Sequence, residues 1–445
     1  MSEPTQSEQV KDKRQAIRIE PDLRFKKDLI AAGGETLTKC FQCGTCTVAC
    51  PLSPDTDPFP RKEVLWAQWG LKDRLMADPD VWLCHQCNDC AQLCPREASP
   101  GDILAVIRQN MVEHYSAPGF LARWVARPAM LPVLFAIPAV LMLAAIWLTG
   151  GFSAHEAAGH GHFLADGIFA PGGQDLKTPP NFDHFFAHYP IIIFFTAFVG
   201  LALLGGLAGV VRYWKAMKAT FPGNPDGHGR TRTNTDEHGQ AERGNPSLIG
   251  CLIAALRDIL THKKFTQCEA TANRYYGHLM LFYGFAAMFV TTALAAILYY
   301  TPRQWGVLAG YPFAWWHPVK LLGNVGGLVF LAGLAIVVAE RLKGTKISPR
   351  SNYVDWLFIV VIGATVVTGV ICQAARIAGS ASPAYAWYFV HLLFVFFLLV
   401  YLPYSKFAHL LYRTVAMMYA HYSGREVVAV PAQEPKGEAQ EQNAA

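Results

Sequence analysis

The chain has 445 residues and a formal net charge of +5; 52 % of the residues are hydrophobic and only 16 % are charged. Soluble proteins carry about 25 % charged residues, so this balance excludes an ordinary soluble protein and predicts a membrane protein of two or three domains. The small positive charge requires no nucleic-acid partner, because many basic residues flank apolar segments. The apolar excess begins near Met130, and residues 1–115 have the composition of a soluble module.

Residues 1–29 are polar and charged, and we expect them to form a tail without a signal peptide. The module that follows should therefore stay in the cytoplasm, where thiols are kept reduced. Eight of the eleven cysteines lie in two short runs within this module. In a reducing compartment, such clustering indicates metal binding and not disulfide formation.

The two cysteine runs are copies of one motif. Residues 40–51 (CFQCGTCTVACP) and residues 84–95 (CHQCNDCAQLCP) both follow the spacing C-x2-C-x2-C-x3-C-P. This spacing is typical of bacterial ferredoxins, in which three close cysteines hold one [4Fe–4S] cluster and the fourth reaches the other cluster. Structural zinc, the alternative, usually takes two C-x2-C pairs and four ligands in all. The predicted ligand sets are Cys40, Cys43, Cys46 and Cys94 for the first cluster, and Cys84, Cys87, Cys90 and Cys50 for the second.

The link between the runs is longer than in a minimal ferredoxin, and residues 59–76 look helical. We therefore predict a helical ferredoxin-like domain with two clusters over residues 30–115, followed by an interfacial linker over 116–128. The basic and aromatic residues of 61–74 form either a docking surface for another protein or a solvated helix face.

Six apolar stretches are long enough to cross a bilayer as helices, which takes roughly 20 residues each. Basic residues gather at the ends that we assign to the cytoplasm, so both termini are expected on the cytoplasmic side of the inner membrane. We predict an all-α protein whose transmembrane cytochrome b domain covers 129–413, with a cytoplasmic loop over 214–275 and a tail over 414–445. The predicted spans lie near 129–149, 189–211, 276–300, 318–339, 353–373 and 385–412.

Histidines within the spans are candidate haem ligands, because ionisable groups are costly in lipid and are usually functional there. His391 and His409 are 18 residues apart in the last span, which is five helical turns, so they share a face with one near each membrane surface. Pro403 lies between them and makes the shared face approximate. The simpler alternative is interfacial histidines at helix ends. We predict an inner haem b held by His278 and His409, and an outer haem b held by His391 with His317, or with His188 or His184 instead.

The motifs resemble known families. Positions 30–115, with the two cysteine runs, resemble the C subunit of heterodisulfide reductase. Positions 190–413, with the 18-residue histidine spacing, resemble the haem-b membrane subunits of heterodisulfide reductase (its E subunit) and of respiratory nitrate reductase (its gamma subunit). The nitrate reductase family places its other two ligands ten residues apart on one helix, but Met288 stands ten residues after His278. The outer ligand must therefore come from elsewhere.

A fusion of these two modules resembles the C subunits of quinone-interacting membrane-bound oxidoreductases of sulfate respiration. That resemblance implies menaquinol as the membrane donor, two heterodisulfide-reductase-A-like flavoprotein partners, and adenylylsulfate reductase as the electron acceptor. The chain would then be one component of a quinone-linked oxidoreductase and would complete no reaction alone.

Other functions remain open at this point. One alternative is the membrane arm of a heterodisulfide- or sulfite-reductase-type complex, and another is a passive membrane anchor. A proton pump or transporter should carry acidic residues inside its spans, and these spans hold almost none. The quinone site is expected either at His317 with Lys320 on the outer side, or on the inner side near His278, Arg274 and Lys406.

Overall fold

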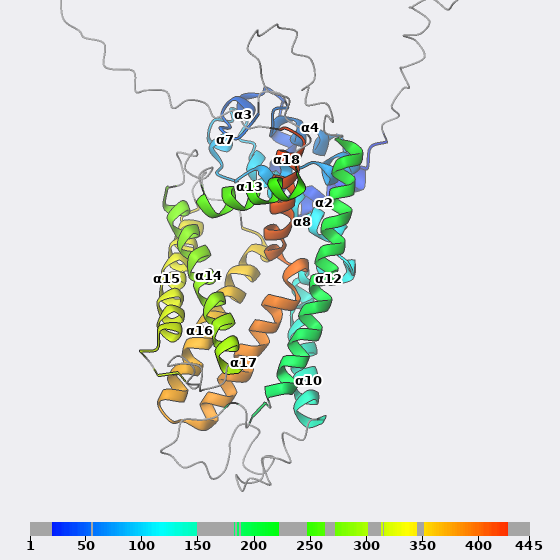
Figure 1. The fold of residues 1–445 in the computed structure, drawn as a ribbon. Coiled ribbons are helices and arrows are strands. Elements are labelled where there is room, and N and C mark those ends of the chain that lie inside the picture. Colours follow the sequence, from blue (N-terminus) through cyan, green and yellow to red (C-terminus); the bar gives the residue numbers. More distant parts are fainter. Residues whose placement is uncertain are drawn as a thin grey trace, which may run out of the picture.

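The computed structural model describes residues 20–54, 57–148, 182, 185–186, 188–221, 247–262, 272–300, 313–314, 316–344 and 351–425. Within these residues the chain is almost entirely helical, and none of them lies in a strand. A bundle of long helices stands below a smaller module of short helices at one end (Figure 1). The predicted all-α architecture is confirmed for this part of the chain.

The N-terminal module is built from short helices around one apolar core. Its last helix is the longest, because Pro100 at its first turn suits a helix start and an apolar face follows. The core includes Leu37, Phe59 and Leu104, each 0 % exposed. The module comprises α2 (Leu23–Ala31), η1 (Glu35–Lys39), α3 (Thr45–Val48), α4 (Arg61–Gln68), α5 (Lys72–Ala77), α6 (Asp80–Leu83), α7 (Asp89–Gln92) and α8 (Pro100–Tyr115).

Six helices are long and apolar enough to cross a membrane, as predicted. Their candidate spans are Pro128–Leu148, Tyr189–Thr220, Arg274–Tyr299, Pro318–Leu342, Tyr353–Ile377 and Pro383–Val400. The membrane part of the chain comprises α9 (Gly119–Val125), η2 (Pro128–Met130), α10 (Leu131–Leu148), α12 (His188–Thr220), α13 (Leu248–Thr261), α14 (Ala272–Tyr300), α15 (Pro318–Leu342), α16 (Tyr353–Ile377), α17 (Ala381–Val400), η7 (Leu402–Tyr404), η8 (Lys406–Ala408) and α18 (His409–Tyr422).

The last predicted span, 385–412, is not one helix. Helix α17 ends at Val400, two short 3-10 turns follow, and a new helix, α18, begins at His409. Pro403 lacks the N–H that would continue the helical ladder, and Ser405 is extended, with its hydroxyl accepting from the N–H of Phe407 at 3.2 Å. The predicted shared face of His391 and His409, which assumes a continuous helix, is therefore lost.

Two domain boundaries also differ from the expected ones. Residues 214–220 belong to α12 and not to a loop, and residues 414–422 belong to α18 and not to a tail. Both helices continue into the N-terminal module, as Figure 1 shows. Tyr213 and Tyr412 from these two helices pack on Tyr115 of the module, with ring centroids 5.2 and 6.3 Å apart respectively. The core of the module thus extends into the ends of α12 and α18, and the rest of the bundle has a core of its own.

Helices α14 and α15 pack unusually closely through glycines. A Cβ added at Gly284 would lie 2.8 Å from the carbonyl oxygen of Gly326, and one at Gly333 would lie 2.8 Å from that of Gly277. The glycines on each helix are seven residues apart, so they recur on one face. Small residues that allow close backbone approach are typical of membrane helix pairs. This pairing fixes α14, which carries His278.

Candidate functional site

The structure brings the eight motif cysteines together in two groups of four. Cys40 and Cys46 lie in the electrostatic environment of Cys43, and Cys40 also in that of Cys94. Cys50 of the first run lies in the electrostatic environment of Cys84 and Cys87 of the second run. Cys90 lies in that of Cys84, Cys87 and Cys50. These are the two sets that the motif predicts, with the fourth cysteine exchanged between them. Their role as cluster ligands stays a prediction.

Each cysteine run curls through left-handed backbone positions. Gln42 and Gln86, two residues after the first cysteine of each run, have φ of 61° and 53°. Gly44 and Asn88, the next such positions, have φ of 88° and 69° and precede the short helices α3 and α7. Glycine and asparagine tolerate this region best. The repeated turns direct three thiols of each run toward one point.

The motif spacing and the grouping of the thiols fit iron–sulfur clusters. Burial raises the pKa of Cys50 to about 12, with the charge of Cys84 as the next cause. Burial likewise raises the pKa of Cys46 to about 11, ahead of the effect of Cys40. These two thiols are therefore neutral unless a coordinating metal deprotonates them.

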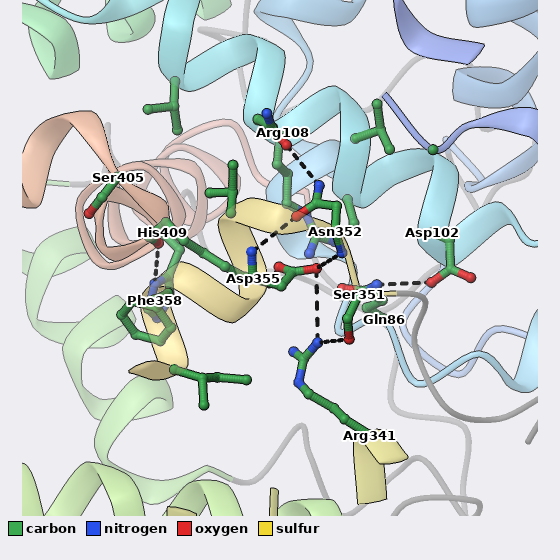
Figure 2. A pocket seen from close by; sticks show the side chains of 18 of the residues that line it. Gln86, Asp102, Arg108, Arg341, Ser351, Asn352, Asp355, Phe358, Ser405 and His409 are labelled. Carbon is green, nitrogen blue, oxygen red and sulfur yellow. Dashed lines mark hydrogen bonds and ion pairs between the residues drawn. The ribbon is translucent and has the colours of Figure 1, made fainter. Parts of the chain in front are cut away.

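A large cavity separates the second cysteine run from the membrane helices. Gln86 and Cys87 line it from the N-terminal module, and His278 and His409 line it from α14 and α18. Figure 2 shows Gln86 and His409 around this space. Five cationic side chains also line it: Arg108, Arg274, Arg341, Lys406 and Arg413. The cavity thus joins one predicted cluster to both predicted inner haem ligands.

The two inner histidines meet across this cavity from different helices. His278 lies near the start of α14 and lies in the electrostatic environment of His409, the first residue of α18. The Nδ1 atom of His409 lies 2.8 Å from the carbonyl oxygen of Lys406. A carbonyl only accepts, so Nδ1 donates, and Nε2 is left to coordinate a metal. The break before α18 places this carbonyl within reach.

Arginines bridge the cavity from the bundle and from α8 to the second cysteine run. The Nη1 atom of Arg274 donates to the carbonyl oxygen of Gln86 at 3.0 Å. Arg108 donates to the carbonyl oxygen of Cys84 at 2.7 Å, and Arg413 to the same oxygen at 3.4 Å. These bonds fix the loop that carries Cys84 and Cys87 over the membrane helices.

The far side of the cavity is a fixed polar network. The side chains of Asn352 and Asp355 form a reciprocal capping box at the start of α16. Asp355 also accepts from Lys406, and Arg341 lies 3.9 Å from it (Figure 2). Asn352 donates to Gln109 of α8 at 2.9 Å, which ties the bundle to the module.

Sequence reasoning missed His262. This residue follows α13 with φ of 51°, is 5 % exposed, and its ring centroid lies 5.5 Å from that of His278. Its only sequence signal is a histidine before two lysines at the end of an amphipathic helix, which does not indicate its neighbours. Contacts between distant segments bring it beside the inner histidine pair.

The predicted outer pair is not brought together by the contacts of the described residues. His391 lies against α16, with Nδ1 3.1 Å from the Thr368 hydroxyl, and a Cβ at Gly369 would lie 3.1 Å from its ring. His317 caps α15 by accepting from the N–H of Val319 at 3.3 Å and stacks on Phe313. Of the alternatives, His184 lies outside the described residues, and His188 begins α12 with a side chain that is not described.

Comparison with known families agrees with this division. Residues 36–98 match the model of the 4Fe-4S dicluster domain, and residues 187–429 match the model of citrate utilization protein B. The second match covers more than half of the chain. The chain belongs to the citrate utilization protein B family. Its N-terminal module is an iron–sulfur region similar to the C subunit of heterodisulfide reductase.

Individual relatives match different shares of the chain. The C subunit of the H(2):CoB-CoM heterodisulfide,ferredoxin reductase of Methanothermobacter marburgensis is 38 % identical over 101 residues, covering 23 % of this chain and 52 % of that protein. A protein of Archaeoglobus profundus that is described as like the heterodisulfide reductase C subunit is 39 % identical over 85 residues, 19 % of this chain and 45 % of that protein. The match thus spans about half the length of these relatives.

A third relative covers most of the chain. Citrate utilization protein B of Escherichia coli is 26 % identical over 348 residues, which cover 76 % of this chain and 80 % of that protein. No solved structure matches the chain. The predicted resemblance to the C subunit of heterodisulfide reductase is confirmed, whereas the resemblance to its E subunit and to the nitrate reductase gamma subunit stays a prediction.

Proposed function

We propose that the chain carries electrons between a quinol in the membrane and a flavoprotein in the cytoplasm, with haem b and two [4Fe–4S] clusters as its bound carriers. One observation supports this most. The cavity has the loop of the second cysteine set on one wall and the histidine pair on the other. A passive membrane anchor would not need cysteines and a histidine pair at the same cavity.

The residues around the cavity fit a haem b. His278 and His409 line it from two helices and would hold the haem iron. Leu281, Leu334 and Phe358 would supply apolar contact, and cationic side chains of the cavity would pair with the haem carboxylates. A haem bound there would supply one-electron chemistry. The Lys406 carbonyl would fix the His409 tautomer, and α14 would hold His278 in place.

The proposed outer haem b is supported by fewer contacts among the described residues than the inner one. His391 would supply one ligand from α17, since Gly369 and Thr368 leave its ring against α16. The second ligand would be His317 or His188. Replacing each histidine in turn distinguishes them, because only the loss of the true ligand should abolish binding of the outer haem.

The direction of flow and the partners follow from the resemblances. We propose menaquinol as the donor, two heterodisulfide-reductase-A-like flavoproteins as partners, and adenylylsulfate reductase as the final acceptor. The similarity to citrate utilization protein B over 76 % of the chain favours a second candidate. In that case the chain would be the membrane subunit of a complex that takes part in citrate utilization. Which partner protein reduces or oxidises the purified chain discriminates between the two.

Haem content tests the proposal. The purified protein should show two low-spin haems b with two histidine ligands each, and His278→Ala and His409→Ala should each remove the same inner haem. His421→Ala is the matched control, because His421 lies on α18 with its Nε2 atom 3.4 Å from Asp258, outside the cavity. The pairing is refuted when the first two variants lose different haems, or none.

A further inference from the structure

The two cysteine runs would place their proposed clusters in different surroundings. In the second run, the loop between the first two cysteines holds His85 and Gln86, which line the cavity opposite the inner histidines. The same positions of the first run hold Phe41 and Gln42. Because the runs share spacing and left-handed turns, the two loops present equivalent faces of their clusters. The first loop therefore marks the face through which its own cluster would meet a redox centre.

That face of the first run is open. The Cys43 thiol is exposed, whereas Cys87, at the equivalent position of the second run, is only partly exposed and lines the cavity. Three large apolar side chains from the cysteine runs are also exposed: Phe41 at 67 %, Val48 at 90 % and Leu93 at 59 %. We call these three residues the apolar collar. Val48 ends α3 and Leu93 follows α7, and these two short helices pack against each other.

Two arginines border the collar. The Arg96 guanidinium lies 4.1 Å from the centroid of the Phe41 ring. Arg61 lies close enough to Cys43 that its charge acts on that thiol, and its side chain lies 3.9 Å from a Cβ built at Gly44. An apolar centre with cations at its edge is the pattern of a protein-binding site for an acidic partner face.

We propose that the apolar collar is the docking surface for a soluble flavoprotein whose contact face is apolar and acidic, and that the cluster of the first cysteine set is where electrons cross between the two proteins. This inference rests on the proposed function. Each crossing moves one electron, so the flavin of the partner is reduced by one electron when this chain is oxidised by one, or the reverse. The collar lies at the end of the molecule opposite the spanning helices, as α3 and α7 in Figure 1 show, so a bilayer does not cover it.

The collar also revises an expectation. Residues 61–74 are one candidate docking surface by sequence, but Val64 and Ala67 of α4 are 0 % exposed. Trp66 is instead flanked by Lys62 and Arg74, within 5.6 and 5.7 Å of its ring centroid, and packs on Phe221. Most of this stretch therefore packs against the module. Trp69 is 52 % exposed, and Arg61 at the start of the stretch borders the collar.

Affinity for the partner tests the proposal. The probe is the purified heterodisulfide-reductase-A-like flavoprotein of the same organism, bound to the full-length chain in detergent. Val48→Glu should weaken binding by about tenfold or more, because a charge at the centre of an apolar contact is costly. Leu23→Glu is the matched control, since Leu23 is 65 % exposed on α2 away from the cysteine runs, and it should bind normally. Arg96→Gln should slow association at low salt and have less effect at high salt.

Two further measurements keep the test decisive. Low-temperature EPR of Val48→Glu should show both clusters unchanged, which its exposed side chain allows. The proposal is overturned when the wild-type chain does not bind the flavoprotein, when Val48→Glu binds normally, or when Val48→Glu instead abolishes association between copies of this chain. Binding is measured without quinol, so weakened binding together with a failure of quinol to reduce the wild-type chain would refute the proposed function and leave the docking surface standing.

Discussion

At the scale of single residues, Cys50 shows how far the fold separates neighbours in sequence. It ends the first cysteine run, yet the cysteines that act electrostatically on its thiol are Cys84 and Cys87 of the second run. We expect Cys50→Ser to perturb the cluster of Cys84, Cys87 and Cys90 and to leave the other cluster intact. EPR of the reduced variant measures this, with Cys251→Ser on α13 as the control that should change neither. Loss of the first cluster alone would contradict crossed ligation.

A second residue-scale feature is a buried charged cluster that ties the end of α18 to the module. Asp80 is 0 % exposed and accepts from Arg425, which follows α18. Lys62 lies 2.7 Å from Asp80 and 2.6 Å from Asp57. Glu63 is also 0 % exposed, and neither of its oxygens has a hydrogen-bond partner. Lys62 lies farther from Glu63, at 3.6 Å, so the charge of Lys62 neutralises mainly the two aspartates.

Glu63 should therefore be protonated in the folded protein. Burial, and then the charge of Asp78, raises the pKa of Glu63 well above its usual range. A carboxyl whose folded pKa is raised contributes stability that is present at low pH and is lost as the pH rises through the folded pKa. We predict that the wild-type protein becomes more stable as the pH falls below neutral, until other carboxylates protonate.

The variant Glu63→Gln isolates this effect. It keeps the shape and removes the titration, so its melting temperature should depend less on pH than that of the wild type, and near neutral pH it should be no less stable. Arg425→Met should destabilise the protein by about 1.5–3 kcal/mol, because it removes a charged hydrogen bond to the buried Asp80 and leaves Lys62 as the neighbouring cation. Thermal unfolding of the detergent-solubilised protein over a pH series measures both. An unchanged pH slope in Glu63→Gln would show that the proton resides elsewhere.

At the scale of elements, the pairing of α14 with α15 depends on the absence of side chains. Gly284→Val would place atoms within 3 Å of the α15 backbone and should cost about 1–3 kcal/mol. Because α14 carries His278, the same variant should also hold less inner haem. Gly200→Val on α12 is the matched control, since nothing lies within 4 Å of a Cβ there. Thermal stability and haem content of the two variants give the comparison, and equal losses would refute the close packing.

The sequence predicts some elements well because their signals are local. Six apolar stretches identify six helices of membrane length, and the repeated cysteine spacing identifies two groups of four. The sequence underestimates the break between Val400 and His409, because Pro403 alone predicts only a bend. The full interruption also needs the extended Ser405 and its cap on Phe407, which depend on how the chain enters the module.

Other parts of the site have no local signal. His262 reaches His278 only because α13 ends beside α14, and the five cations of the cavity come from separate helices. The predicted outer haem site shows the opposite case, in which the sequence has a signal that the structure does not follow. The histidine spacing suggests an aligned pair, but the interrupted helix removes the shared face, and the second outer ligand stays open between His317 and His188.

At the scale of the whole molecule, the parts lie in order from the long apolar helices to the exposed end of the module. Tyr213 and Tyr412 pack on Tyr115 in the core of the module, so packing fixes α12 and α18 against it. The cavity lies between them, the second cysteine set borders it, and the first set lies toward the apolar collar. This order would place the proposed second cluster nearest the proposed haem.

The central claim is that electrons pass between the membrane and the module across this cavity. Its most direct test is anaerobic reduction by a menaquinol analogue of the full-length protein in liposomes, bound to its flavoprotein partner, followed by optical spectra for haem and EPR for the clusters. We predict that the quinol reduces both haem and clusters in the wild type. In His409→Ala, the clusters should be reduced by dithionite but no longer by quinol. Reduction of the clusters by quinol at the wild-type rate in His409→Ala, or no reduction of the wild type, would contradict the account.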